Sequence, residues 1–202
     1  MIMAEKVITE LVQTIKFPEG VQIEVHKDNK LSLKANGQSL ERTFKSHRIN
    51  FELKGRSLAV VGKPANKSTY VLQQTFISHI KNMVEGLLYG YKYDLRILYS
   101  HFPMTATVDK DKVLVKNFLG EKFPRKVSIR GNAKVEVKGQ EITVSGNNKE
   151  DVGQTASNLE QATKVRGKDI RRYQDGIYIV NFGNTKEKPA KVVEIINGRE
   201  AQ

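Results

Sequence analysis

The sequence has no cysteine and no long apolar run. Without cysteine, its 202 residues form neither disulfides nor thiolate metal sites, which is consistent with a reducing compartment. No stretch of about 18 consecutive apolar residues occurs, so we expect no membrane-spanning helix. Residues 1–17 lack the basic start and apolar middle of a secretory signal peptide. The expected location is therefore the cytoplasm.

Acidic residues are few relative to basic ones. The chain has 34 Lys and Arg residues against 22 Asp and Glu residues, a formal net charge of +12. Such an excess attracts polyanions, with nucleic acid as the first candidate and an anionic membrane surface as the second. The alternative is a soluble protein that is merely basic, although solubility by itself favours mixed or acidic surfaces.

No constellation of residues predicts catalysis. No serine lies in a nucleophile-elbow context, and the turns 62–68 and 146–153 lack the Gly-Lys-Ser/Thr ending of a phosphate loop. The histidines are scattered without metal-ligand spacing: His26, His47, His79 and His101. We expect no enzyme, no metal, no cofactor and no small-molecule substrate. A small hydrolase that combines distant carboxylates with His47 or His101 is the alternative.

Two stretches of the chain share one pattern. Residues 51–62 (FELKGRSLAVVG) and 135–146 (VEVKGQEITVSG) both alternate apolar and polar residues around a Lys-Gly pair. The first glycine of each stretch, Gly55 or Gly139, predicts a hairpin turn between two strands. A tandem duplication of one small domain explains this better than a longer repeat array.

Helical spacing of apolar residues follows each hairpin. The first pattern covers residues 72–87 and ends at Gly90. The second, weaker pattern covers residues 152–163, with Asn148 as its N-cap and Gly167 as its end. Each copy therefore reads as four strands, a helix and a closing strand, which the sequence places at residues 93–100 and 176–182.

These elements predict an α+β fold with two similar domains, each a small, mostly antiparallel sheet packed by one helix. We expect an N-terminal helical extension at residues 1–16, with its helix at 4–14. The first repeat follows at 17–101 and the second at 102–183, with a boundary near residues 100–103. The charged tail at 184–202 is expected to be mobile or ordered only by a partner.

Both basic clusters lie in the second copy. The segment KVRGKDIRRYQDGIYIV, residues 164–180, leads from five cations into a strand, with Asp169 among the cations. Its cations are Lys164, Arg166, Lys168, Arg171 and Arg172. The other cluster lies on a predicted long connection, residues 120–134, and includes Lys122, Arg125 and Lys126. Residues 86–96, the expected counterpart of the first cluster in copy one, hold aromatic residues instead. We therefore expect copy one to be structural and copy two to bind.

The residue types favour RNA phosphates. Arginine binds phosphate bidentately, and lysine adds charge, while the helix start at residues 147–149 offers free N–H groups. Tyr173 either stacks on a base or ribose or anchors the following strand in the core, and the sequence leaves both open. No groove-reading helix or aromatic sheet face is evident, which favours shape and backbone recognition of folded RNA.

Residues 146–179 (GNNKEDVGQTASNLEQATKVRGKDIRRYQDGIYI) resemble the C-terminal signature of the large-ribosomal-subunit protein L-six family. The resemblance covers residues 10–182. Asp169 and the additional Arg172 depart from the bacterial Lys-Gly-Lys-Gly-Ile-Arg-Tyr pattern. They resemble the archaeal and eukaryotic branch, whose eukaryotic member is called L-nine.

The resemblance implies a structural constituent of the large ribosomal subunit that acts in translation. Such proteins bind large-subunit rRNA mainly through the C-terminal copy, near the stalk base and the sarcin–ricin region, beside other large-subunit proteins. Lys168, Arg171 and Tyr173 match the family motif best, and Asn147, Lys149 and Gln154 lie on the matching helix start. Arg166 and Arg172 are further phosphate candidates because of their charge. The alternative is a non-ribosomal RNA chaperone.

Overall fold

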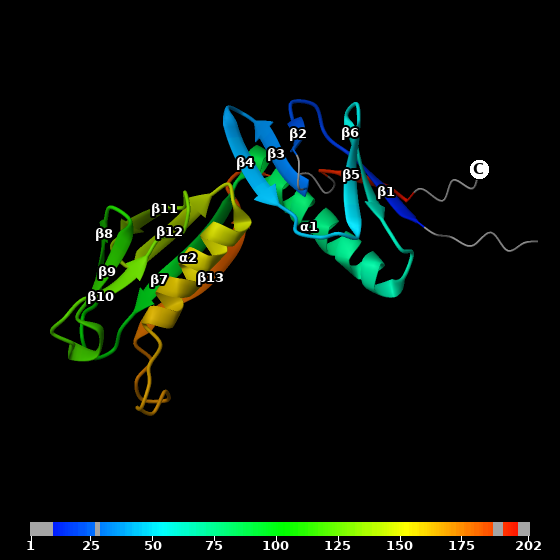
Figure 1. Ribbon diagram of the computed structural model, residues 1–202. Coiled ribbons are helices and arrows are strands. Elements are labelled where there is room, and N and C mark those ends of the chain that lie inside the picture. The colour runs from blue at the N-terminus through cyan, green and yellow to red at the C-terminus, as the bar shows by residue number, and fades with distance from the viewer. Residues whose placement is uncertain (1–9, 27–28, 188–191, 198–202) are drawn as a thin grey trace, which may run out of the picture. The chain divides into compact units, whose positions relative to one another are not determined.

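A computed structural model describes residues 10–26, 29–187 and 192–197. The chain divides into two compact units, Met1–Leu88 with Pro189–Gln202 and Tyr89–Lys188. Each unit combines antiparallel sheets with one long helix (Figure 1), which confirms the predicted α+β class.

The first unit contains two sheets. The four-stranded sheet has the order β14-β1-β6-β5, and the three-stranded sheet has the order β2-β3-β4. Their elements are β1 (Leu11–Lys16), β2 (Gln22–His26), β3 (Lys30–Ala35), β4 (Gln38–Thr43), β5 (Ile49–Lys54), β6 (Ser57–Gly62), α1 (Lys67–Tyr89) and β14 (Glu194–Asn197).

The second unit repeats this arrangement. Its four-stranded sheet has the order β11-β12-β7-β13, and its three-stranded sheet has the order β10-β9-β8. Its elements are β7 (Tyr91–Leu98), β8 (Thr105–Asp109), β9 (Lys112–Lys116), β10 (Arg125–Ser128), β11 (Lys134–Lys138), β12 (Glu141–Gly146), α2 (Lys149–Ala162) and β13 (Gly176–Asn184). From the opposite edge, β13-β7-β12-β11 matches β14-β1-β6-β5 strand for strand.

The two predicted hairpins at Gly55 and Gly139 and the helix that follows each of them are confirmed. Lys54 pairs with Ser57 and Lys138 with Glu141, so Gly55 and Gly139 open two-residue turns with positive φ, as hairpins of this length require. The α2 helix starts where its cap was predicted, because the Asn148 side chain accepts a hydrogen bond from the Glu150 N–H.

Each helix packs on its sheet through a glycine at the preceding strand end. A Cβ on Gly62 would lie 2.7 Å from Thr69 Cγ2, and a Cβ on Gly146 would lie 2.8 Å from Val152 Cγ2. Real Cβ atoms do not approach other atoms so closely, so both positions need glycine. The equivalent contacts in the two units support a duplication.

The second unit has one core, which draws on both sheets and the helix. Leu95, Ile142 and Ile177 come from the four-stranded sheet, Val113 comes from the three-stranded sheet, and Leu159 comes from α2. All five are at most 2% exposed. The helix and the strand that follows it therefore converge on the same core, and Val165 of the connection between them packs against it.

The predicted closing strand of the first copy belongs to the second unit. Residues 93–98 lie in β7, which pairs with β12 and β13. The first sheet is closed instead by β14, which pairs with β1 from the C-terminal tail. The alternating pattern of a strand does not show which other strand it pairs with, and β7 pairs with strands that lie later in the sequence. The division between the units falls between Leu88 and Tyr89, not near residues 100–103.

The predicted helix at residues 4–14 is wrong over its described part. Residues 11–14 belong to β1, which lies between β6 and β14, while residues 4–9 lie outside the described residues. Ile15 is fully buried in this strand. Pairing on both edges of β1 outweighs the local helical pattern, as tertiary context often does.

The tail is also partly corrected. Residues 194–197 form β14, so this segment is ordered by its own chain. Val192, Val193 and Ile195 pack against the hydrophobic core of the first unit. Residues 188–191 and 198–202 of the predicted tail lie outside the described residues.

We expect that removing residues 192–202 destabilises the first unit by on the order of 3 kcal/mol, because three partly buried apolar side chains and the β1 pairing are lost. Hydrogen exchange should show faster exchange in β1 and unchanged protection in β7. A matched chain that lacks only residues 198–202 keeps β14 and should protect β1 like the full chain. Equal β1 protection in both shortened chains would contradict the role of β14.

Candidate nucleic-acid interface

Residues 164–175, here called the basic loop, connect α2 to β13 and are fixed at both ends. Thr163 is 2% exposed. Its Oγ1 accepts a hydrogen bond from the Ile177 N–H at 2.9 Å and donates to the Leu159 carbonyl at 3.2 Å. The end of the helix and the start of the strand are therefore joined through one side chain. The α2 helix ends at Ala162, so the prediction that Gly167 closes it is wrong.

Asp175 fixes the C-terminal end of the basic loop from a second direction. It is fully buried, and its Oδ1 accepts a hydrogen bond from the Ser100 N–H at 2.7 Å. His101 Nδ1 lies 3.9 Å from the same oxygen. The loop is thereby attached to the chain just beyond β7.

Inside the basic loop, Asp169 organises a turn. Its Oδ1 accepts from the Arg171 N–H at 2.9 Å, and its carbonyl accepts from the N–H groups of Arg172 and Tyr173. Gly167 has a φ of 69°, which favours glycine over other residues. The carboxylates of Asp169 and Asp175 both accept backbone hydrogen bonds, so neither serves mainly to neutralise the loop's cations.

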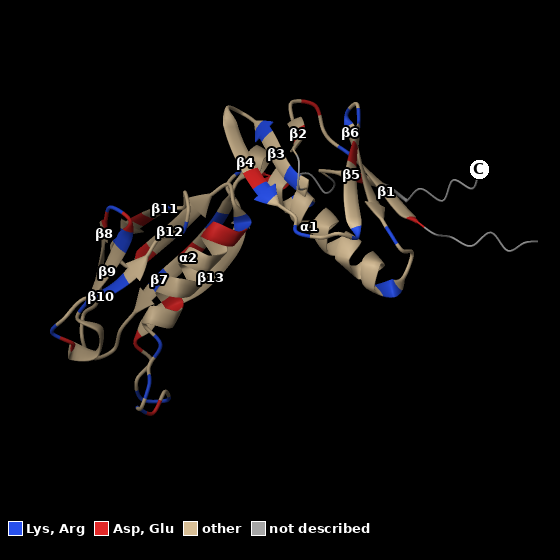
Figure 2. Ribbon diagram, viewed as in Figure 1, with Lys and Arg blue, Asp and Glu red and all other residues tan. Residues whose placement is uncertain are grey.

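The cations of the basic loop face solvent. All five are exposed: Lys164, Arg166, Lys168, Arg171 and Arg172. Within the described parts of the chain, none of them forms an ion pair. Figure 2 shows their positive charge along the loop that follows α2. A fixed backbone thus presents unneutralised cations, as phosphate binding requires.

The segment around residues 121–126 lies beside the basic loop. Arg125 Nη1 donates to the carbonyl of Ala162 at the end of α2. The hydrogen bond from Arg125 lowers the pKa of Glu121 below its usual range, and the positive charge of Lys168 on the loop lowers it further. The two predicted basic clusters therefore meet at one end of α2.

The Arg125 side chain itself is held by contacts within the protein. Its Nε donates to Glu121 Oε2 at 2.8 Å, and its guanidinium lies 4.2 Å from the centre of the Phe118 ring. Lys122 and Lys126 are exposed beside it. The predicted connection is also partly regular structure, since β10 pairs with β9. Arg125 thus braces the site, and the two lysines remain available to a ligand.

The predicted helix-start residues lie elsewhere. Asn147 and Lys149 are at the opposite end of α2, about 20 Å along the helix from the basic loop at 1.5 Å per residue, and Gln154 is about 12 Å from it. Lys149 Nζ lies 5.7 Å from the Tyr91 ring centre, and Gln154 Nε2 donates to Asn158 Oδ1 at 2.8 Å. The structure therefore separates these three from the loop cluster.

Tyr173 lies at the edge of the basic loop and outside the core cluster of the second unit. It is half-buried, with the His101 ring 5.2 Å away between centres. Lys168 Nζ lies 4.8 Å from its ring centre. Its position favours a contact with a ligand over a role as a core anchor.

Sequence reasoning missed two exposed apolar side chains. Phe123 is 85% exposed beside Lys122, and Ile170 is 68% exposed within the basic loop. Both stand inside runs of basic residues, where their apolar character could have marked them. Contacts through apolar surface are therefore available beside the charge.

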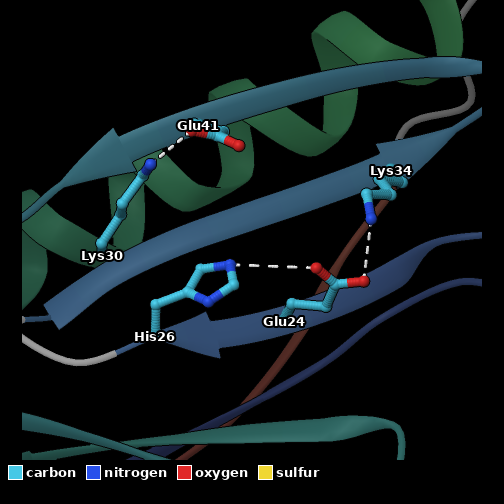
Figure 3. A network of polar contacts seen from close by, with 5 residues as sticks. All are labelled: Glu24, His26, Lys30, Lys34 and Glu41. Atoms are coloured by element: carbon cyan, nitrogen blue, oxygen red, sulfur yellow. Dashed lines mark hydrogen bonds and ion pairs between the residues drawn. The ribbon is translucent and has the colours of Figure 1, made fainter.

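Two lysines of the first unit, by contrast, are ion-paired with glutamates. On its three-stranded sheet, Lys34 Nζ lies 2.9 Å from Glu24 Oε1 and Lys30 Nζ lies 2.6 Å from Glu41 Oε2 (Figure 3). His26 Nε2 lies 3.8 Å from Glu24 Oε2. Hydrogen bonds from the two lysines lower the pKa of Glu24 and of Glu41. These cations are neutralised within the protein, whereas those of the basic loop are not.

The described ranges support neither a metal site nor a membrane-spanning helix. Among these residues no group of three or more His, Asp or Glu side chains could hold a metal ion. No helix in the same ranges is long and apolar enough to cross a membrane.

Comparison with known proteins relates the chain to one family. Residues 102–176 match the family described as ribosomal protein L6. Large ribosomal subunit protein uL6 of Methanosarcina mazei is 43% identical over 173 residues, which cover 86% of this chain and 98% of that protein. The protein of the same name from Staphylothermus marinus is 44% identical over 183 residues, covering 87% and 97%. That of Haloarcula marismortui is 39% identical over 171 residues, covering 84% and 95%.

We expect Glu121→Gln to lower the free energy of unfolding at neutral pH by about 0.5 kcal/mol, the size of a partly exposed ion pair. Because the folded pKa of Glu121 is depressed, its contribution is present above the unfolded pKa of about 4.3 and is lost as the pH falls through the folded pKa. Denaturant unfolding of variant and wild type should therefore converge as the pH falls below the depressed folded pKa of Glu121.

Glu141→Gln is the matched control for this prediction, because Glu141 forms an ion pair with Arg96 whose side chains are 70% and 54% exposed. Its effect should be smaller at every pH. A constant difference between Glu121→Gln and wild type from pH 3 to pH 7 would contradict the proposed ion pair.

Proposed function

Because the chain belongs to the ribosomal protein L6 family, whose archaeal members are named large ribosomal subunit protein uL6, we propose that it is a structural component of the large ribosomal subunit that binds rRNA. It acts in translation, in the cytoplasm, without catalysing a reaction. The observation that carries the rRNA contact is the exposed, unneutralised charge of the basic loop.

The binding residues fall into a main group and a minor group. The main group comprises the loop cations with their two neighbours: Lys122, Lys126, Lys164, Arg166, Lys168, Arg171 and Arg172. The minor group comprises Asn147 and Lys149 at the other end of α2, where N–H groups at the helix start favour phosphate, and Gln154 further along the helix. Arg125 supports the main group by its bond to Ala162.

The contact is made chiefly with the RNA backbone. Arginine side chains on a fixed loop bind phosphate oxygens in pairs, and such contacts position a protein without reading sequence. By the family resemblance, the bound region lies near the stalk base and the sarcin–ricin region, beside other large-subunit proteins. Recognition then rests on the shape of the folded rRNA.

We expect binding to large-subunit rRNA fragments to weaken steeply with salt, by about −0.7 to −0.9 in the log–log slope per neutralised phosphate. The triple variant Arg166→Ala/Arg171→Ala/Arg172→Ala should reduce the magnitude of this slope by about 2 to 3 and weaken binding at low salt. The side chains of these arginines make no hydrogen bond or ion pair among the described residues, so the variant should remain folded.

The matched control is Lys92→Ala/Arg96→Ala on β7, because these cations are ion-paired with Asp94 and Glu141. It should bind nearly like the wild type. A salt-independent affinity would refute the phosphate contacts, and an equal loss in the control would refute the assignment to the basic loop. Comparable affinity for unrelated RNA, with no co-sedimentation with large subunits, would favour an RNA chaperone.

A further inference from the structure

A pocket lies beneath the basic loop in the second unit. Its volume is about 310 Å³, and it is bounded by the last turn of α2, the loop itself and the start of β13. Small-ligand pockets start near this size, at about 300 Å³. Its lining includes one cation of the basic loop, Lys164, and one carboxylate of α2, Glu160.

The walls of this pocket are mainly apolar and aromatic. Val165 and Ile170 come from the basic loop, and Ile177 comes from β13. Ile177 is buried, whereas Ile170 is 68% exposed at the pocket edge. Ile170 thus offers apolar surface to a ligand at the edge of the pocket.

Two tyrosines complete the walls, one from the basic loop and one from β13. Tyr178 donates its hydroxyl hydrogen to the Gln174 carbonyl at 3.1 Å, which fixes the ring. Gly176 allows this position, because a Cβ there would lie 3.3 Å from Tyr178 Cε2 and 3.3 Å from the Thr163 carbonyl oxygen. Tyr173 is held by contact with His101. The pocket is therefore built in advance of ligand binding.

One wall carries a neutral polar group. Gln161, on the last turn of α2, also lines the pocket. No hydrogen bond of its side-chain amide occurs among the described residues. An amide offers both a donor and an acceptor, which is the chemistry of a nucleobase edge.

We propose that this pocket holds one unstacked nucleobase of the RNA whose phosphates the basic loop binds. The proposal rests on the proposed function and adds a contact of a different chemistry. A largely aromatic and apolar cavity beside a cationic loop matches a nucleotide, with the base inside and the phosphate at the arginines of the loop. Proteins recognise splayed-out RNA bases by such stacking on aromatic side chains. An apolar side chain of a protein partner would not account for the five cations of the adjoining loop.

The first test uses the full-length wild-type protein and NMR. Adenosine or uridine 5′-monophosphate at millimolar concentration should shift the methyl signals of Val165, Ile170 and Ile177 saturably. Ribose 5-phosphate should shift only amides of the basic loop, such as those of Arg171 and Arg172. Methyl signals that stay unmoved with nucleotide, or move equally with ribose 5-phosphate, would overturn the base pocket. So would shifts caused by N-acetylphenylalaninamide and not by nucleotide, which would assign the pocket to a protein side chain.

The second test measures affinity for the large-subunit rRNA fragment. Tyr178→Ala should weaken binding by roughly 5- to 100-fold, the effect of one stacked base, and should leave the salt slope unchanged because no charge is removed. Tyr178→Phe keeps the ring and should restore most of the affinity. The control is Val180→Ala, a 65% exposed residue of the same strand that does not line the pocket.

The two proposals fail separately. If the arginine triple variant loses affinity while a folded Tyr178→Ala protein binds like the wild type, the base pocket is refuted and the phosphate contacts stand. If neither variant loses affinity, both proposals are refuted. Should Tyr178→Ala fail to fold, the NMR titration of the wild type decides the question.

Discussion

The hydrogen bond from the Ile177 N–H to the buried Thr163 side chain closes the basic loop, and the position of every cation on the loop depends on it. Bringing the ends of a loop together costs conformational entropy. Folding of the second unit offsets this cost, since Thr163 at the end of α2 and Ile177 on β13 are both buried. Asp175 adds a second attachment through Ser100. The proposed rRNA contact then uses cations that are already in place, and such preorganisation reduces the ordering cost of binding.

The path of the chain explains why only the second unit carries this loop. In the second unit, α2 is followed by the basic loop and then by the closing strand β13. In the first unit, α1 ends at Tyr89 and the chain continues after Gly90 directly into β7. The closing strand β14 arrives from the other end of the sequence. Residues 86–96 are therefore not a counterpart of the basic cluster. In the described part of the first unit, no helix-to-strand loop follows α1 in which cations could gather.

Patterns within short stretches of the sequence predicted the local structure, whereas the pairing of strands that are distant in the sequence was not predicted. The hairpin at Gly139 and the Asn148 cap depend on neighbouring residues, and both are confirmed. Assigning β7 to its sheet required knowing that it pairs with strands 40 or more residues later. For the site, the charge of residues 164–173 was visible in the sequence. The hydrogen bond from Arg125 to the Ala162 carbonyl was not visible, because the sequence does not show whether an arginine side chain faces solvent or the end of a helix.

The placement of acidic groups decides where the protein attracts a polyanion. On the first unit, Glu24 and Glu41 neutralise nearby lysines. On the second unit, the carboxylates of Asp169 and Asp175 accept backbone hydrogen bonds and thereby shape the basic loop. The same residues that hold the loop in shape thus form no ion pair with its five cations, and those cations repel one another. A bound phosphate backbone relieves this repulsion. Since it acts on the folded loop and not on the unfolded chain, RNA binding and the stability of the second unit are thermodynamically linked.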